Sequence, residues 1–215
     1  MISPAMTTDT TSGDIAGRAA DAIADGLTSH GFDVRMPGQP GGMFLQVTNV
    51  RGSLCELTIF GCGVFAWEYR RLDGSQPDPS VAAAMIMRIL GADPDANGRV
   101  PVPDSPRRTL KGQIGQALAG CGMQVRLNVL DKDESAYEVY TLITVTNPAL
   151  PGRGTVCIDD DGLICWRGQI PGPEQPEDGL DLGELTRTLA SALTVTTQAP
   201  RQGFTAVRPE DRDHN

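Results

Sequence analysis

The sequence predicts an α+β protein made of two tandem α-β-β-β-β-α repeats, each an antiparallel meander sheet with its helices on one face. Three observations lead to this prediction. The two Trp residues of the 215-residue chain each follow a glycine at the same spacing, in the pairs Gly63/Trp67 and Gly162/Trp166. A helix pattern that stops at a glycine precedes short strand patterns in both halves. A proline-rich stretch without periodicity separates the halves, and we expect them to be related by pseudo-twofold symmetry.

Aligned residues support the duplication in two blocks. In the first block, residues 23–35 match residues 114–126, and the identical positions are Ile, Leu, Gly, Val and Arg. The second block runs without a gap from Cys55 to Leu90 against the second half. Its identical pairs are Ile59/Ile158, Gly63/Gly162, Trp67/Trp166, Gln76/Gln175, Pro77/Pro176, Arg88/Arg187 and Leu90/Leu189.

The first repeat opens with a helix whose apolar residues Ile15, Ala19, Ile23 and Leu27 recur at i+4 spacing. Gly31 follows at the position where a left-handed residue commonly ends a helix. Short alternating stretches then predict four strands, and a second apolar-periodic stretch predicts the closing helix. The predicted elements are a helix over 14–29, strands over 32–36, 43–49, 53–60 and 64–71, and a helix over 80–90.

The second repeat follows the same order, and Gly122 takes the place of Gly31 at the end of the first helix. Glycines in the stretches 61–63 and 160–162 predict tight hairpin turns before the last strand of each repeat. The predicted elements are a helix over 106–120, strands over 123–129, 137–146, 153–158 and 163–168, and a helix over 181–193.

These elements divide the chain into five parts, because the proline-rich linker lacks periodicity and both ends lack apolar patterning. The parts are a disordered N-terminus (1–12), repeat 1 (13–91), a proline-rich linker (92–105), repeat 2 (106–197) and a disordered C-terminal tail (198–215).

Strand alternation predicts which face of each sheet lies against the helices. Matched positions that are apolar in both repeats are Leu57, Ile59, Phe65 and Trp67 in the first repeat, and Val156, Ile158, Ile164 and Trp166 in the second. The opposite face of repeat 2 is unusually apolar for a solvent-facing surface, and such patches mark contact surfaces. It either packs on repeat 1 or binds another protein. The candidate partner-binding residues are Tyr140, Leu142, Leu163, Cys165 and Arg167.

Composition bears on the class of partner. The formal net charge of −9 disfavours nucleic acid and acidic membrane surfaces, and no apolar run reaches the length of a membrane span. The start lacks the pattern of a secretory signal, so we expect a cytoplasmic protein. The five Cys include no Cys-x-x-Cys pair, which is typical of small core residues in a reducing compartment.

The sequence lacks the common patterns of catalytic and ligand-binding residues. The chain has no Gly-x-Ser-x-Gly, and its two His are His30, at a predicted helix end, and His214, in the tail. The stretch from Asp131 fails as a calcium loop because Ala136 replaces the required glycine. The carboxylates of 159–161 favour a polar hairpin tip, with a divalent cation as the alternative. The sequence therefore predicts no catalytic, metal-binding or cofactor-binding residues and no cofactor.

The helix stops at Gly31 and Gly122, the strand runs Trp67-Glu-Tyr69 and Cys165-Trp166-Arg167, and the closing helices together carry a family resemblance. In this order of elements the chain resembles the secretion-chaperone-like and YbjN-like domains in tandem duplication, and RWD-type interaction modules share the order. The resemblance implies a non-catalytic protein that binds partners.

Two hypotheses about function remain. The first is a protein-interaction module, an adaptor, chaperone-like or immunity-like binder, that uses a sheet face or a groove between the repeats. Its partner is another protein, and it is a monomer with pseudo-dimeric repeats or a homodimer. The second is an enzyme or small-ligand binder with a cleft between the repeats, in which carboxylates and Arg35, Arg126 or Arg167 anchor the ligand.

Overall fold

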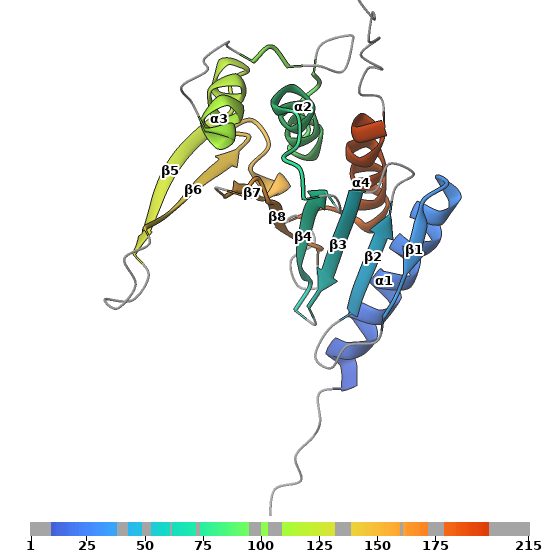
Figure 1. The fold of residues 1–215 in the computed structure, drawn as a ribbon. Helices are drawn as coiled ribbons and strands as arrows, with labels where there is room; N and C mark the ends of the chain where they lie inside the picture. The colour runs from blue at the N-terminus through green and yellow to red at the C-terminus, as the bar shows by residue number, and fades with distance from the viewer. Residues whose placement is uncertain are drawn as a thin grey trace, which may run out of the picture.

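The computed structural model describes residues 10–37, 43–48, 53–60, 62–71, 74–94, 100–102, 109–131, 139–159, 161–171 and 179–197 (Figure 1). The helices are α1 (Thr10–Ser29), α2 (Pro79–Ile89), α3 (Leu110–Gly120) and α4 (Leu182–Thr197), with a short 3-10 helix, η1 (Pro151–Arg153). The strands are β1 (Asp33–Arg35), β2 (Met43–Thr48), β3 (Ser53–Ile59), β4 (Val64–Arg71), β5 (Gln124–Asp131), β6 (Val139–Thr146), β7 (Thr155–Ile158) and β8 (Ile164–Gln169). The predicted α+β class is therefore confirmed.

The eight strands form a single antiparallel sheet in the order β1-β2-β3-β4-β8-β7-β6-β5. Each half of the chain contributes four consecutive strands as a meander, and β4 pairs with β8 to join the halves. At this junction Trp67 is the register partner of Trp166. The two halves thus meet through strand edges, and the face of the second-half strands that carries Cys165 and Arg167 is not stacked on the first half.

The helices lie on one side of this sheet (Figure 1). Contacts between α1 and α4, α4 and α2, and α2 and α3 order the helix layer as α1-α4-α2-α3. The closing helix of each half therefore packs beside the opening helix of the other half. In α1, a side chain added at Gly26 would meet Thr186 Cγ2 of α4 at 2.5 Å, so the missing side chain permits this close approach.

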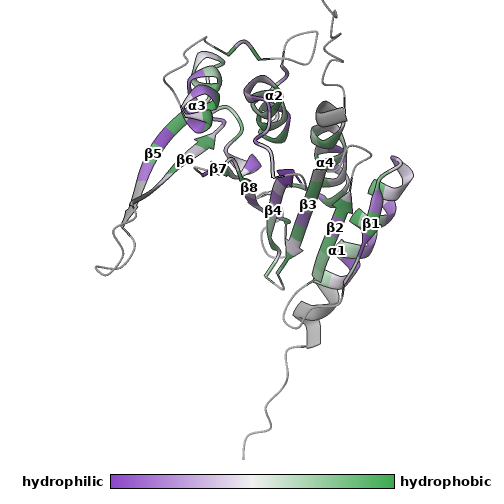
Figure 2. Cartoon of the chain, viewed as in Figure 1, coloured by the Kyte–Doolittle hydropathy of each residue, from purple (hydrophilic) through white to green (hydrophobic). Residues whose placement is uncertain are grey.

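The core lies between the sheet and the helix layer, and hydrophobic residues recur on the strands and on α2 (Figure 2). The strand residues predicted to face the helices are all buried, at 1% exposure or less: Leu57, Ile59, Phe65, Trp67, Val156, Ile158, Ile164 and Trp166. The Trp166 ring meets Phe65 edge-on at 4.8 Å between centroids, which is a favoured aromatic geometry.

Local sequence explains where α2 begins and ends. Asp78 caps its N-terminus by accepting hydrogen bonds from the backbone N–H groups of Ser80 and Val81, and Pro79 fits the first turn, where no N–H partner is needed. At the other end, Asn147 Nδ2 donates to Leu90 O at 2.8 Å. This side chain satisfies a carbonyl that a helix end leaves open and ties the loop before η1 to α2.

The structure corrects several boundaries. Helix α1 begins at Thr10, so residues 10–12 are helical although the sequence assigned them to a disordered N-terminus. The linker is partly packed, because Val100 is buried and its carbonyl accepts a hydrogen bond from Ser80 Oγ at 2.9 Å. The 3-10 helix η1 was not predicted. Residues 1–9 and the predicted C-terminal tail 198–215 lie outside the described residues.

Candidate functional site

The predicted partner-binding residues belong to strands of the second half, on the side of the sheet opposite the helices. We call this side of β5, β6, β7 and β8 the β5–β8 face. Leu142 of β6, Leu163 next to β8 and Cys165 of β8 are half-buried, and Arg167 of β8 is exposed. The backbone of Tyr140 pairs with Leu130 in the β5–β6 ladder, and its side chain lies outside the described part. The structure thus brings the described members of the set onto one surface.

Two thiols lie at the centre of the β5–β8 face, because Cys157 of β7 is the register partner of Cys165. Burial raises the pKa of both thiols, while neighbouring Arg167 acts in the opposite direction. Arg167 also donates a side-chain hydrogen bond to Cys165. Protonated thiols behave as small apolar groups, so this pair adds to the apolar character of the face.

Charge divides the open side of the sheet into two parts. On the first-half strands, Glu56 and Glu68 are register partners, and Arg70 forms an ion pair with Glu56 at 3.5 Å. On the β5–β8 face, Arg126 and Arg167 are exposed, and the described acidic side chains of its hairpin end are Asp159 and Asp161. Glu68 of β4 lies at the border of the face as the register partner of Cys165. The β5–β8 face therefore combines half-buried apolar side chains and thiols with two arginines and with polar residues such as Asn128 and Thr144, which hydrogen-bond to each other.

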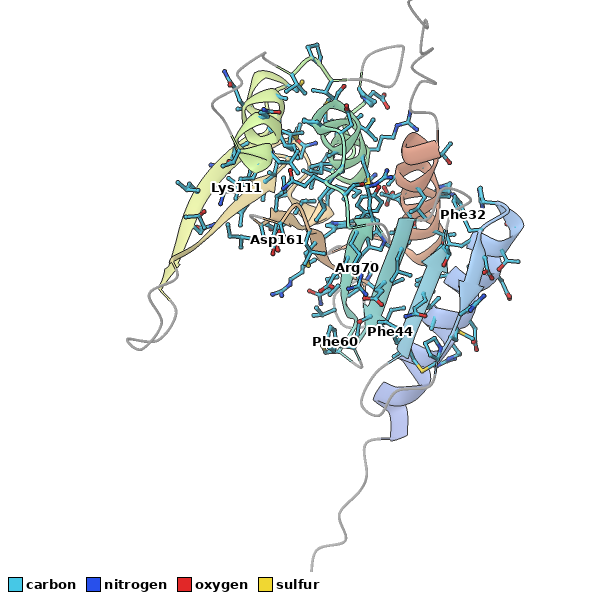
Figure 3. All side chains as sticks on the ribbon, viewed as in Figure 1. Phe32, Phe44, Phe60, Arg70, Lys111 and Asp161 are labelled. Carbon is cyan, nitrogen blue, oxygen red and sulfur yellow. The ribbon has the colours of Figure 1, made fainter. Side chains whose placement is uncertain are left out.

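The hairpin end of β7 is a structural turn. Asp159 Oδ1 accepts hydrogen bonds from Leu163 N at 2.8 Å and Asp161 N at 3.0 Å. Arg70 and Asp161 line a hollow of about 320 Å³ between this turn and the end of β4 (Figure 3). Within the described ranges, no group of three or more His, Cys, Asp or Glu is placed to hold a metal ion.

A hollow of about 520 Å³ lies in the helix layer between α2 and α4 and is lined by Arg88, Arg153 and Arg187. We call it the arginine pocket. It is bounded by the closing helix of each half and by η1, so it is a cleft between the halves. Its size is within the range of small-ligand sites.

Each arginine of this pocket is positioned differently. Arg88 of α2 donates to Ser191 Oγ of α4 at 3.0 Å. Arg153 of η1 donates to Thr188 Oγ1 at 3.0 Å and forms an ion pair with Glu184. The Arg153 carbonyl in turn accepts a hydrogen bond from Trp166 Nε1 at 2.7 Å, so a core residue fixes the backbone of a pocket residue.

Sequence reasoning chose other arginines for a cleft between the repeats. Arg35 lies on β1 and Arg126 on β5, at opposite edges of the sheet, and Arg167 lies on the open face of β8. The structure does not bring these three together. The available signal was the identical pair Arg88/Arg187 in the alignment. Nothing in the sequence indicated Arg153, because the predicted strand over 153–158 placed it at the start of a strand, whereas it ends η1.

One charged side chain is buried among the described residues. Lys111, in the first turn of α3, is 8% exposed, and its Nζ donates to Thr141 O of β6 at 3.0 Å and to Thr141 Oγ1 (Figure 3). These hydrogen bonds compensate the burial of the cation and fix α3 on the sheet.

Comparison with known proteins assigns no relatives: no protein-family model, curated protein or solved structure matches the chain. No helix in the described part of the chain has the length and apolar character needed to cross a bilayer.

Proposed function

We propose that this protein is a non-catalytic interaction module of the cytoplasm, an adaptor or chaperone-like binder, that holds a partner protein on the β5–β8 face. The observation that carries the proposal is the composition of that face. No described helix covers it, and Leu142, Leu163, Cys157 and Cys165 lie half-buried on it beside Thr144 and Thr155. Apolar side chains on an open sheet face, flanked by arginines, are typical of interaction sites.

The partner segment is apolar and acidic. Arg126 and Arg167 are the exposed charges on the described strands of the face, whereas the chain as a whole carries −9. A basic partner would be drawn to the rest of this acidic molecule, and an acidic one is accommodated where arginines flank an apolar centre. The first-half strands, with Glu56 opposite Glu68, repel such a segment.

We further propose that the chain arose by tandem duplication of one secretion-chaperone-like or YbjN-like unit, with a pseudo-twofold axis at the junction of the halves. Two features support this proposal. The sheet contains the four strands of the first half in chain order, followed by the four strands of the second half in reverse order. In the helix order α1-α4-α2-α3, a twofold axis between α4 and α2 would likewise relate α1 to α3 and α2 to α4. The aligned pair Trp67/Trp166 meets in register at the junction. In this arrangement the two halves of one chain pair as the two subunits of a homodimer would.

The test is capture of a partner from native lysate, compared between matched variants. The doubly reversed variant R126E/R167E and, separately, Leu163→Asp are expected to lose the partner. Arg35→Glu, which reverses the aligned arginine on β1, is expected to retain it. Raising salt to about 1 M, where the screening length falls to about 3 Å, should weaken capture by the wild type.

A photo-reactive amino acid at Thr144, which lies on β6 next to Cys157 in register, locates the contact. Crosslinks from Thr144 with none from Thr58 on β3 support the β5–β8 face. Capture that survives both R126E/R167E and Leu163→Asp would show that the partner binds elsewhere.

A further inference from the structure

We propose that the arginine pocket between α2 and α4 binds a small, doubly charged oxyanion, a ligand that carries phosphate or carboxylate groups. This site lies in the helix layer, on the opposite side of the sheet from the β5–β8 face, and the two proposals stand independently.

Three guanidinium groups converge on one hollow of about 520 Å³ in a chain whose net charge is −9. Like charges in one place are unfavourable unless an anion neutralises them. Two carboxylates line the same hollow, and one of them, Glu184, is already paired with Arg153. Asp93, the other, is exposed at the end of α2.

Arg187 is the free cation of the pocket. It lies on α4, is exposed, and forms no hydrogen bond or ion pair with any residue that the structure describes. Its guanidinium retains all of its N–H donors in the fork that matches an oxyanion. Arg88 uses Nη1 for Ser191, which orients the remainder of its guanidinium at the same hollow.

The hydroxyl groups of α4 behave in two ways. Thr186 Oγ1 and Thr194 Oγ1 donate to carbonyls one turn earlier, Leu182 O at 2.8 Å and Ala190 O at 2.7 Å. Thr188 and Ser191, which line the pocket, instead accept hydrogen bonds from Arg153 and Arg88. A hydroxyl that accepts from an arginine still has its own proton to donate.

Together these groups form a donor set suited to an oxyanion. Arg187 supplies a bidentate contact, Arg88 adds charge, and the protons of Thr188 and Ser191 donate to further oxygens. Glu184 pairs with Arg153 and is expected to oppose the ligand by like-charge repulsion. The site is positioned by the core, because Trp166 fixes the backbone of Arg153.

The experiment is calorimetric titration of the full chain with sodium phosphate and, separately, sodium succinate, at constant ionic strength. Arg187→Ala is expected to weaken binding about tenfold or more, because it removes charged hydrogen bonds. Arg187→Lys keeps the charge without the fork and should fall between. Glu184→Gln is expected to tighten binding severalfold. Arg35→Ala, at an exposed arginine on β1, is the matched control and should leave binding unchanged.

Phosphate binding that depends on Arg187 assigns a phosphorylated ligand, and succinate binding with the same dependence assigns a dicarboxylate. Equal binding by wild type and Arg187→Ala, or no binding of either probe up to about 10 mM, overturns the proposal. Thermal unfolding without ligand checks that Arg187→Ala folds normally, as expected for an exposed side chain. Capture of a protein partner on the β5–β8 face is unaffected by Arg187→Ala, so failure of one proposal is distinguishable from failure of the other.

Discussion

Trp67 and Trp166 are register partners across the β4–β8 junction, yet only Trp166 forms an indole hydrogen bond within the described structure. Its Nε1 donates to Arg153 O at 2.7 Å, whereas Trp67 stacks on Tyr69 with ring centroids 6.1 Å apart. Both indoles are buried to within 1% of complete burial. Two residues at matched positions therefore have different roles: one packs, and the other also holds η1.

This difference predicts unequal costs for the same substitution. Trp166→Phe removes the donor and leaves Arg153 O without its partner, whereas Trp67→Phe removes volume alone. The free energy of unfolding should fall about 1–2 kcal/mol further for Trp166→Phe than for Trp67→Phe, as expected for a lost buried hydrogen bond. Urea denaturation followed by far-UV circular dichroism measures both. Equal losses would mean that the hydrogen bond contributes nothing to stability.

Two glycines of α1 provide a matched pair that tests the contact with α4. Gly17 has nothing within 4 Å of an added Cβ, so Gly17→Ala should stabilise the protein by about 0.5–1 kcal/mol through helix propensity. Gly26→Ala places a Cβ 2.5 Å from Thr186 Cγ2 and should destabilise it by about 1–3 kcal/mol. Thermal or urea unfolding measures both effects.

A second substitution, at Thr186, shows whether the loss of stability in Gly26→Ala comes from this contact between α1 and α4. Thr186→Ser removes the clashing methyl and keeps the hydroxyl that donates to Leu182 O. The double variant Gly26→Ala/Thr186→Ser should recover most of the stability lost in Gly26→Ala. If the double variant is no more stable than Gly26→Ala alone, α4 does not pack on α1 in this way.

Arg167 influences the pH at which the Cys165 thiol becomes reactive. Burial raises the pKa of the Cys165 thiol, and the hydrogen bond and charge of Arg167 lower it. The thiolate is the reactive form, so Arg167→Ala, which removes the lowering effect, should shift the alkylation profile of Cys165 to higher pH and slow the reaction near pH 8. Mass spectrometry of iodoacetamide-treated protein in a Cys157→Ala background follows this thiol alone. An unchanged or lowered profile in Arg167→Ala contradicts the expected contact.

The first half of the chain should not be stable as a folded monomer. Within residues 1–94, β4 lacks its partner β8, and α1 lacks its neighbour α4. An unpaired edge strand is a template for association, so we expect folded material from this segment to be dimeric. Light scattering measures the mass of the segment, and circular dichroism shows whether it is folded. A folded monomer would contradict the expectation, and a folded dimer would agree with it.

Much of the fold could be predicted because its signals are local. The strand pattern around Phe65 and Trp67 alternates with period two, and the predicted strand over 64–71 agrees with β4. Gly31 and Gly122 have φ values of 85° and 84°, the left-handed conformation expected beyond a helix end. These features depend on neighbouring residues, which a sequence displays directly.

The arrangement of the halves could not be predicted in the same way. Edge-to-edge joining of β4 to β8 and the placement of α4 beside α1 depend on residues more than 90 positions apart. The open face was predicted correctly for Leu142, Leu163 and Cys165, since alternation assigns faces. The arginine pocket was missed because Arg88, Arg153 and Arg187 converge only after α2 and α4 pack and η1 forms.

Because α4, the last helix of the chain, packs beside α1, the first helix, the order of synthesis also affects folding at the ribosome. The first half is complete in sequence by about residue 94, but the helix that covers the flank of α1 spans Leu182–Thr197. At about 5–20 residues per second, the ribosome takes several seconds or more to make the intervening chain. During that interval the edge of β4 and the exposed flank of α1 await partners that have not been translated. The nascent chain is therefore expected to need protection by general chaperones until its last helix emerges.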